Sequence, residues 1–444
     1  MRIIIAGSGE VGTHLAKLLS KEDQDIMVID KNAERLAMLD ANYNLMTHRG
    51  SPISFDGLKE AGAERCDLFI AVTPWETTNV TACSIAKSIG AKRTVARIDN
   101  YEYMRSVNRC FFSGIGVDEL IYPEYLAALE IRTALERSWV RHWVELHDGR
   151  LIMVGVKINS CAQLVDMQLK ELAKIHHHFH IAAIKRRHET IIPRGDDRIC
   201  DGDIVYFITT KEHVDNIRRM CGKVDEPIRR VMIMGGSRIA IRLAHLVGDD
   251  YRITIMDVDR EVCRRIADKC PHATVINGDA RDIETLRSEG VADMDAFIAL
   301  TDSSESNILS CLTAKEFGVK KTVAEVENIQ LISEAENLNI GTIINKKLLA
   351  SSKIFQLLID ADTENAKCLA LADAEVAEIE VREGARIAKA PVKDLKISRD
   401  ITLAGMVRDG KGMLITGATH LRPGDFVLVF SLSGAMNKLE KLFK

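Results

Sequence analysis

A glycine-rich segment near the start of the chain has the residue types of a nucleotide-binding loop. Gly7-Ser8-Gly9-Glu10-Val11-Gly12 fits the pattern G-x-G-x-x-G. The first glycine of this pattern allows a tight turn, the second lets the backbone approach a pyrophosphate, and the third allows a helix to pack closely on a sheet. Helix N–H groups that follow such a turn face the phosphates of the ligand. We therefore expect all six residues to form the phosphate-binding part of a nucleotide site.

An acidic residue follows this loop at the spacing that a ribose requires. Asp30 ends the apolar run Ile26–Ile29, and a carboxylate about 20 residues after the glycine loop accepts hydrogen bonds from ribose hydroxyls. The same carboxylate repels a 2′-phosphate. The sequence therefore predicts a site for NAD(H) or an adenine nucleotide rather than for NADP.

Four further residues lie where later strands are expected to end. Thr73 and its neighbour Pro74 follow one apolar run, Arg97 ends another, and Ser51 follows Gly50. The carboxyl ends of parallel strands form the ligand-binding edge of an open α/β sheet. Thr73 is a candidate for binding phosphate or ribose, Arg97 for binding phosphate or a neighbouring carboxylate, and Ser51 for a place near the base. Loop capping is the alternative for each of these residues.

Short apolar strands that alternate with helices must position these residues. An apolar run is followed by the glycine turn and then by leucines and valine at helical spacing, which predicts strand, tight turn and helix. The same alternation continues along the first hundred residues and predicts βαβ units with a parallel sheet. The expected strands are 2–6, 26–29, 67–72 and 94–97.

The chain is an internal duplication. An offset of 228 residues pairs Gly7 with Gly235 and Asn79 with Asn307, whereas an offset of 222 aligns the segments near Arg186 and Arg408. The change of offset indicates that each half contains two modules joined by a tolerant connector. We expect a Rossmann-like domain over 1–136, a small α+β subdomain over 137–224, a second Rossmann-like domain over 228–360 and a second small subdomain over 364–444.

The second glycine loop departs from the pattern of the first. Gly235 is kept, but Ser237 and Ala240 occupy the places of the other two glycines. Asp257 corresponds to Asp30, whereas Glu325 replaces Arg97. Gly235 and Asp257 are thus candidate nucleotide contacts, and the sequence leaves open whether this half binds a nucleotide.

The two small subdomains differ from the Rossmann-like domains in their pattern of expected strands and helices. Strands are expected near 151–156 and 204–208 around a helix near 168–173, and the second half repeats this arrangement at 376–381 and 426–430. The two connectors, 100–136 and 329–359, carry apolar residues at a spacing that predicts amphipathic helix. The short basic run 185–188 is expected to be a solvated turn.

Composition excludes several classes of protein. The chain has 444 residues, 28% of them charged and 46% hydrophobic, and a net charge of −4, so it is expected to be a soluble protein of several domains with no bulk electrostatic support for binding nucleic acid. No apolar run approaches the ~20 residues of a membrane span, and we expect a cytosolic location.

The ten cysteines form no C-x-x-C pair, and the histidine run 176–180 lacks carboxylate or cysteine ligands at a recognised spacing. No metal site and no hydrolase motif is therefore expected.

The duplicated order of modules, together with the glycine loop, Asp30, Ala71-Val72-Thr73 and Ala96-Arg97, resembles the TrkA family along essentially the whole chain. Members of this family are cytosolic regulatory subunits of bacterial Trk potassium uptake systems and are built from two tandem RCK (KTN) units. The resemblance implies an α/β fold in which each Rossmann-like domain precedes a small C-terminal subdomain. It also implies NAD(H) as ligand, with ATP and ADP as further ligands, and connectors that help to assemble a ring.

The same resemblance implies the partners. A dimeric or tetrameric ring of this chain would dock under a TrkH-type membrane potassium channel, at the inner face of the cell membrane, and would act without catalysis. An NAD-dependent oxidoreductase is the alternative, because a Rossmann-like domain with an acidic residue at this position is common among such enzymes. Against this alternative, the small modules offer only short strands and turns in place of a substrate domain.

Overall fold

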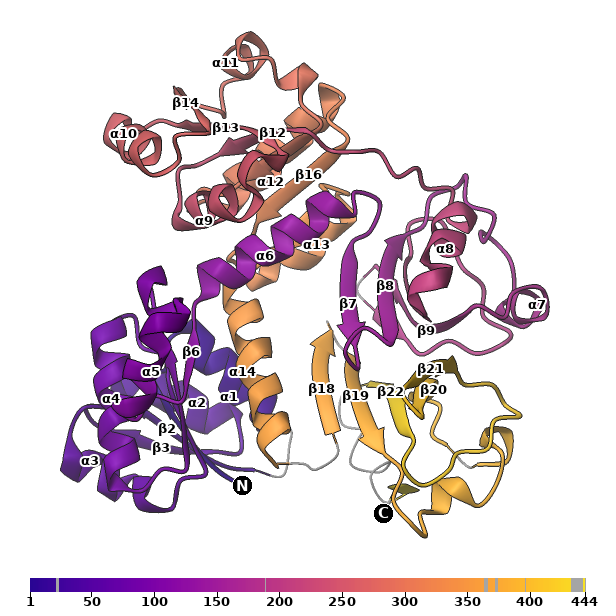
Figure 1. The fold of residues 1–444 in the computed structure, drawn as a ribbon, viewed down its shortest axis with the longest axis horizontal. Coiled ribbons are helices and arrows are strands. Elements are labelled where there is room, and N and C mark those ends of the chain that lie inside the picture. Colours follow the sequence, from indigo (N-terminus) through magenta and orange to yellow (C-terminus); the bar gives the residue numbers. More distant parts are fainter. Residues whose placement is uncertain are drawn as a thin grey trace. The chain divides into compact units, whose positions relative to one another are not determined.

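The computed structural model describes residues 1–20, 24–187, 189–362, 366–371, 374–395, 397–432 and 442–443. Its elements form two similar halves in succession, and each half contains a six-stranded sheet followed by a five-stranded sheet (Figure 1). The strand pairs described in the six-stranded sheets are parallel, and those in the five-stranded sheets are antiparallel. The predicted α/β fold with two tandem units is confirmed.

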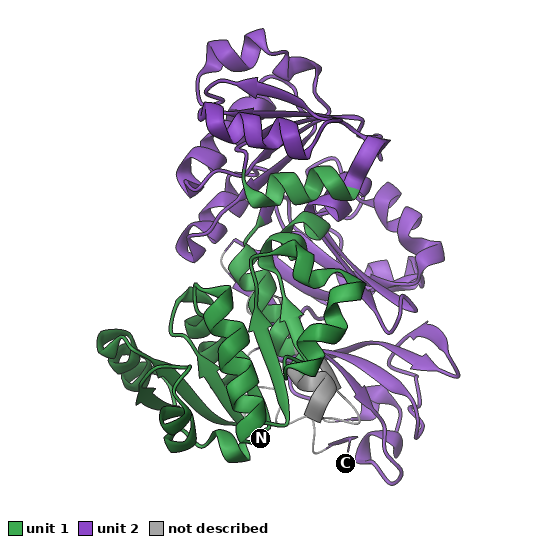
Figure 2. Cartoon of the chain, turned by 60° about the vertical axis from the view of Figure 1, so that its left-hand side comes forward, with its two compact units in different colours: residues 1–130, 237–246, 344–362 green, residues 131–236, 247–343, 363–444 purple. Residues whose placement is uncertain are grey.

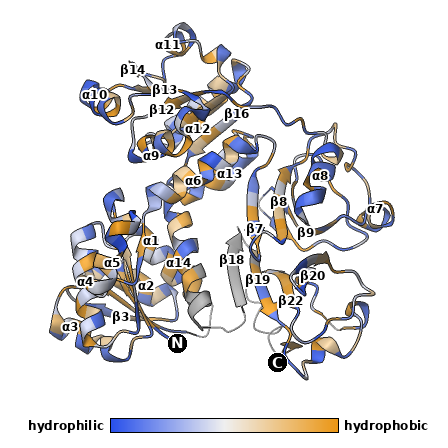
Figure 3. Cartoon of the chain, in the orientation of Figure 1, coloured by the Kyte–Doolittle hydropathy of each residue, from blue (hydrophilic) through white to orange (hydrophobic). Residues whose placement is uncertain are grey.

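The first six-stranded sheet has the strand order β3-β2-β1-β4-β5-β6. Its central strand is apolar on both faces, since Ile3, Ile4 and Ile5 are fully buried, as expected of a parallel sheet covered by helices on both sides. Figure 3 shows that the strands of this sheet are largely hydrophobic. The strands are β1 Arg2–Ala6, β2 Asp25–Asp30, β3 Met46–Arg49, β4 Leu68–Ala71, β5 Arg93–Arg97 and β6 Glu119–Ile121, and the helices are α1 Glu10–Leu19, α2 Ala33–Asn42, α3 Phe55–Glu60, α4 Glu76–Ile89, α5 Ser106–Gly114 and α6 Pro123–Glu136.

The connector over 100–136 is not the continuous amphipathic helix that its pattern predicts. Leu120 and Ile121 are buried in β6, which pairs with β5 as the sixth strand. Pro123 follows directly and begins α6, and proline disfavours helical backbone in the residue before it. The segment therefore contains a short helix, an edge strand and a second helix. The second connector repeats this order with α13 (Ile332–Asn337), β17 (Thr342–Ile344) and α14 (Lys346–Asp362).

The second six-stranded sheet repeats the first, with the order β14-β13-β12-β15-β16-β17. The four strands expected in the first half, 2–6, 26–29, 67–72 and 94–97, all have counterparts here. Their pairing registers are kept, because the buried apolar positions recur at an offset of 228, or 227 in β13. The strands are β12 Arg230–Met234, β13 Arg252–Asp257, β14 Thr274–Asn277, β15 Ala296–Ala299, β16 Lys321–Glu325 and β17 Thr342–Ile344, and the helices are α9 Arg238–Val247, α10 Arg260–Lys269, α11 Ile283–Ser288, α12 Ser304–Glu316, α13 Ile332–Asn337 and α14 Lys346–Asp362.

The two five-stranded sheets share one apolar core, in which Met153 and Tyr206 of one sheet are clustered with Phe430 of the other. The same arginine–aspartate ion pair occurs in both sheets. Arg186 donates to Asp203, and Arg408 donates to Asp425, each through two nitrogens at 2.7–2.9 Å. The elements are β7 His142–Leu146, β8 Leu151–Lys157, α7 Leu169–Ile175, β9 Phe179–Arg186, β10 Glu189–Ile191, β11 Ile204–Thr209, α8 Val214–Met220, β18 Ala366–Leu371, β19 Ala374–Glu380, β20 Ile401–Arg408, β21 Lys411–Leu414 and β22 Phe426–Leu432.

The basic run 185–188 is not the solvated turn that its charge predicts. Lys185 and Arg186 are the last residues of β9, and Lys185 is only 7% exposed. Arg187 begins the turn, with a positive φ of 54°, and His188 lies outside the described residues. Charge alone misled the prediction because ion pairs allow both cations to lie in a strand.

The chain divides into two compact units that do not follow chain order (Figure 2). The first unit contains residues 1–130 together with 237–246 and 344–362, and the second contains 131–236, 247–343 and 363–444. Helices α9 and α14 of the second half thus belong to the unit of the first parallel sheet. The domain boundaries drawn from the sequence stay a prediction. No helix in the described part of the chain combines the length and the hydropathy that crossing a membrane requires.

Candidate nucleotide-binding site

The first glycine loop has a backbone that only glycine accepts at two places. Gly7 has a φ of +114°, and its N–H donates to the carbonyl oxygen of Ile29 at 2.8 Å. A Cβ at Gly12 would overlap the carbonyl oxygen of Gly7. The first and third glycines therefore let α1 start directly at the end of β1.

The second glycine serves a different purpose. A Cβ at Gly9 would meet no atom within 4 Å, so the side of the loop at Gly9 is open. Gly9 is also the N-cap of α1 and supplies no side-chain acceptor for the first N–H groups of the helix. Ser8 is 2% exposed, and its Oγ makes no hydrogen bond. Open space, uncapped N–H groups and a buried hydroxyl without a hydrogen bond fit the phosphates of a nucleotide.

Asp30 holds this loop through its carboxylate. The Ser8 N–H donates to Asp30 Oδ2 at 2.6 Å, and the Asn32 N–H donates to Asp30 Oδ1 at 2.8 Å. Burial raises the pKa of Asp30, but the hydrogen bonds from these two N–H groups, the nearby Ser8 hydroxyl and the charge of Arg35 outweigh burial, and the net effect is a lowered pKa. Asp30 is therefore ionised at neutral pH, and each oxygen keeps a lone pair for a ribose hydroxyl.

Ser51 lies near the backbone of Asp30. The Gly50 N–H donates to the carbonyl oxygen of Asp30 at 3.0 Å, which fixes the neighbouring Ser51 beside the end of β2. The Ser51 carbonyl oxygen accepts the Ser54 N–H at 3.1 Å. The backbone of Ser51 thus helps to shape the turn before α3, and its place near the base of a nucleotide stays a prediction.

Thr73 is clasped by an asparagine that sequence reasoning did not select for the site. Asn79 Oδ1 accepts both the N–H of Thr73, at 2.9 Å, and its hydroxyl, at 2.6 Å. Asn79 Nδ2 donates to the carbonyl oxygens of Thr73 and Arg97 at 3.0 and 2.9 Å. Asn79 therefore ties the ends of β4 and β5 together, and the Thr73 hydroxyl takes part in that tie. The neighbouring Pro74 is exposed.

A chain of alternating charges begins at Arg97. Arg97 Nη2 donates to Asp99 Oδ1 at 3.3 Å, and Arg238 Nη1 lies 3.5 Å from Asp99 Oδ2. Arg238 Nη2 lies 3.7 Å from Glu124 Oε1. Arg238 is the first residue of α9, so the second glycine segment of the sequence contributes a cation to the edge of the first parallel sheet.

A second contact from the later half reaches the glycine loop itself. Lys347 Nζ of α14 forms an ion pair with Glu10 Oε2, and Ser351 Oγ lies 3.5 Å from the carbonyl oxygen of Val11. Local sequence patterns carry no signal for this contact, because 337 positions separate the partners.

The second half keeps the scaffold of the site. The Gly236 N–H donates to Asp257 Oδ2 at 2.6 Å, matching the bond from Ser8 to Asp30. Gly235 has a φ of +98°, as Gly7 has a positive φ. Asn307 clasps Thr301 as Asn79 clasps Thr73. The departures from the first loop are the residues themselves, Ser237, Ala240 and Glu325.

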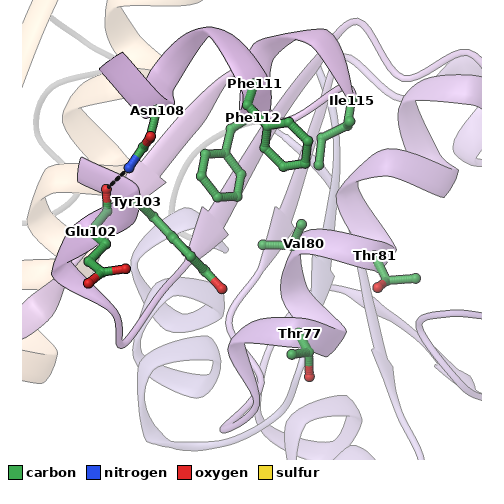
Figure 4. A pocket seen from close by; sticks show the side chains of 9 residues that line it. All are labelled: Thr77, Val80, Thr81, Glu102, Tyr103, Asn108, Phe111, Phe112 and Ile115. Carbon is green, nitrogen blue, oxygen red and sulfur yellow. Dashed lines mark hydrogen bonds between the residues drawn. The ribbon is translucent and has the colours of Figure 1, made fainter. Parts of the chain in front are cut away.

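An apolar pocket lies on the first unit among residues that the nucleotide prediction does not include. It has a volume of about 380 Å³, and the rings of Tyr103, Phe111 and Phe112 face it in Figure 4. Asn108 Nδ2 closes one rim by donating to the carbonyl oxygen of Glu102 at 2.7 Å. Phe111 is 63% exposed, so this face presents a large apolar side chain to its surroundings.

Comparison with known proteins identifies the modules. The chain matches the TrkA-N domain over residues 3–123 and 231–346 and the TrkA-C domain over residues 153–222 and 376–444. It is 30% identical to the Trk system potassium uptake protein TrkA of Vibrio alginolyticus, over 100% of this chain and 99% of the relative. It is also 30% identical to the protein of the same name from Haemophilus influenzae, with the same coverage.

Solved structures show the same fold at low sequence identity. The RCK domain of GsuK superposes with a TM-score of 0.60 at 14% identity, covering 100% of this chain and 94% of that one. The GsuK channel bound to NAD also gives a TM-score of 0.60 at 14% identity, covering 100% and 78% of the two chains. With two TrkA-N and two TrkA-C domains in tandem and relatives aligned along its full length, the chain belongs to the TrkA family.

Proposed function

We propose that the chain is a nucleotide-sensing regulatory subunit of a potassium uptake system, and that its first half binds NAD(H), or ATP and ADP, at the glycine loop. The observation that carries this proposal is the open side of Gly9 at the uncapped start of α1, next to the ionised Asp30. The names of the relatives support the transport system. GsuK structures described as bound to NAD and to ADP, the latter with a TM-score of 0.51, support the ligand class.

The phosphates would lie at Gly7, Ser8, Gly9, Glu10, Val11 and Gly12, and the ribose at Asp30. Thr73, Pro74, Arg97 and Ser51 complete the proposed edge of the site. Gly235 and Asp257 hold the corresponding positions in the second half. These assignments rest on the position of each residue at the carboxyl edge of a parallel sheet, where ligands of such sheets bind.

Two contacts offer a route from the nucleotide to the rest of the chain. Glu10 of the loop pairs with Lys347 of α14, and Asp99 beside Arg97 pairs with Arg238 of α9. A phosphate bound next to Glu10 competes for Lys347, and therefore changes the relative stability of arrangements with and without these pairs. A ligand shifts a conformational equilibrium only by its different affinity for the two states, and these ion pairs supply such a difference.

The proposed partner is a TrkH-type membrane channel, which a homo-oligomeric ring of this chain would contact from the cytoplasmic side of the membrane. The exposed apolar face around Phe111 and Val107, which are 63% and 80% exposed, is a candidate contact between copies. Large exposed apolar patches commonly mark such interfaces.

The alternative, an NAD-dependent oxidoreductase, is less favoured by the geometry. The polar groups at the carboxyl edge of the first sheet bond to one another, as Thr73 does to Asn79 and Arg97 does to Asp99. A dehydrogenase needs a group there that is free to exchange a proton with its substrate.

The test is a binding titration of the full chain with NADH, ATP, ADP and NADP, repeated with Gly9→Asp. The φ of −69° at Gly9 suits any residue, and the added carboxylate would occupy the open side of the loop. We expect NADH and the adenine nucleotides to bind the parent chain about 100-fold more tightly than the variant. Equal binding to both chains would contradict the proposal, and turnover of NADH with a substrate would favour the oxidoreductase.

A further inference from the structure

Two lysines on one face of a five-stranded sheet meet the same helix end in the second unit. Lys157 of β8 and Lys185 of β9 both pair in register with Ile204 of the intervening strand β11, so they lie in one row. Lys185 Nζ lies 2.5 Å from Glu336 Oε2, and Lys157 Nζ donates to the carbonyl oxygen of Glu336 at 3.0 Å. Glu336 is near the end of α13, whose last carbonyls carry the negative end of the helix dipole.

Further cations approach the residues just after this helix. Arg141 Nη2 donates to Asn339 Oδ1 at 2.6 Å, and Lys315 Nζ donates to the carbonyl oxygen of Asn339. Lys223 is half-buried near Lys157. Its backbone bonds to Arg218, but its Nζ forms no hydrogen bond and no ion pair with the described residues. We call Arg141, Lys157, Lys185, Lys223 and Lys315 the basic cluster.

The basic cluster has more positive than negative charge. Burial, together with the charges of Arg141, Lys157 and Lys223, lowers the pKa of Lys315 to about 8. Burial also lowers the pKa of Lys223, with Arg141 adding to the effect. The negative charge of Glu336 raises the pKa of Arg141 and of Lys157, and the charge of Asp201 also raises the pKa of Lys157. Among the described residues, the five cations of the basic cluster thus lie near two carboxylates, those of Glu336 and Asp201. Capping the end of one short helix does not require so many cations.

We propose that the basic cluster binds a multivalent phosphate anion, with Lys223 and Lys157 as its main donors. Lys223 has all three N–H groups available and Lys157 has two, and charge-assisted hydrogen bonds to phosphate oxygens are the strong ones. The anion would link the first small subdomain, which supplies Lys157, Lys185 and Lys223, to the second Rossmann-like domain, which supplies Lys315. This site is separate from the glycine loop and does not depend on the function proposed there.

The chemistry is that of a phosphate group, whether it belongs to a free polyphosphate or to a lipid headgroup. The test uses inorganic pyrophosphate and, in a second arm, vesicles of phosphatidylglycerol. Full-length chain carrying Gly9→Asp serves as the starting protein, so that phosphate binding at the glycine loop is removed. Lys223→Gln and Lys157→Gln are compared with Lys211→Gln, which removes one charge from an exposed position of the same subdomain.

We expect pyrophosphate to bind the starting protein and to raise its unfolding temperature. Lys223→Gln should weaken the affinity about tenfold, since one charge-assisted hydrogen bond is lost, whereas Lys211→Gln should leave it unchanged. Because Lys223 bonds to the described residues only through its backbone, which the substitution keeps, Lys223→Gln is not expected to unfold the chain. Vesicle binding that is lost in the same variant, without pyrophosphate binding, would identify a lipid headgroup as the source of the phosphate. Equal pyrophosphate binding by Lys223→Gln and Lys211→Gln, or binding of neither probe, would overturn the proposal.

Discussion

The two glycine loops of this chain share one scaffold and differ at the places where a nucleotide would lie. Asp30 and Asp257 each accept one N–H of their loop at 2.6 Å and one N–H two residues further on at 2.8 Å. Ser237 stands where Gly9 leaves open space. The bonds that both halves keep serve the fold, and the glycine that only the first half keeps is the feature that ligand binding requires.

The largest effect is expected from Gly12→Val. A Cβ at this position overlaps the carbonyl oxygen of Gly7, so α1 must move away from β1, and overpacking of this kind costs about 1–3 kcal/mol of unfolding free energy. Nucleotide binding should be lost with it. Urea denaturation and a titration with NADH measure the two effects. The control is Ala240→Gly at the corresponding place of the second half, expected to cost about 1 kcal/mol at most. A Gly12→Val chain with unchanged stability and NADH affinity would contradict the close packing of α1 against the loop at this position.

Gly9→Asp should separate binding from folding. The variant is expected to bind NADH about 100-fold more weakly, because the added carboxylate repels the phosphates of NADH, and such repulsion between like charges costs several kcal/mol of binding free energy. Its unfolding free energy should change by less than about 0.5 kcal/mol, or rise, since aspartate is a good N-cap. Ser237→Asp is the matched substitution, and it should leave NADH affinity unchanged. Calorimetric titration measures the NADH affinity of both variants. A larger loss of affinity for Ser237→Asp than for Gly9→Asp would contradict the assignment of the nucleotide to the first loop.

Asp30→Asn and Asp257→Asn test the shared scaffold. Each removes charge from two hydrogen bonds, and each should cost about 1–2 kcal/mol of stability, with a loss of NADH affinity for Asp30→Asn alone. Because the folded chain lowers the pKa of Asp30, the stabilisation by this carboxylate is present above the unfolded pKa of about 4. It is lost as the pH falls through the lowered value. Unfolding curves between pH 2 and pH 7 should therefore converge for parent and Asp30→Asn at the acid end, and a constant difference would contradict this reading.

Thr73→Val and Thr301→Val should give the smallest effects. Each hydroxyl donates to its asparagine at 2.6 Å, so each substitution should cost about 1 kcal/mol. NADH affinity should fall about threefold or less for Thr73→Val, because its hydroxyl is engaged in the clasp. Thermal unfolding and titration check both numbers. A fall in affinity as large as that of Gly9→Asp would assign the Thr73 hydroxyl directly to the ligand.

Local pattern predicted four of the six strands in each parallel sheet, because buried apolar runs bounded by glycine and aspartate have few other conformations available. It also predicted the glycine loop and the place of Asp30. It failed at Leu120 and Ile121, where three residues at the sheet edge give too short a signal to separate strand from helix. It failed at Lys185 as well, because the partner, Glu336, lies 151 positions away.

The contacts of Arg238 and Lys347 with the first half were equally out of reach. Periodicity shows which face of α9 or α14 is apolar, but not which sheet that face covers. The clasp of Thr73 by Asn79 is different, since both halves repeat the threonine and the asparagine six residues apart. That repetition was visible in the sequence and signalled a structural tie shared by both halves.

The most direct test of the account is the number of nucleotides bound per chain. Equilibrium titration of the full chain with NADH, with and without Gly9→Asp, counts the sites and locates them. The account predicts that the parent chain binds NADH at the first glycine loop and that Gly9→Asp weakens this binding about 100-fold while the chain stays folded. Undiminished NADH binding by folded Gly9→Asp would contradict it.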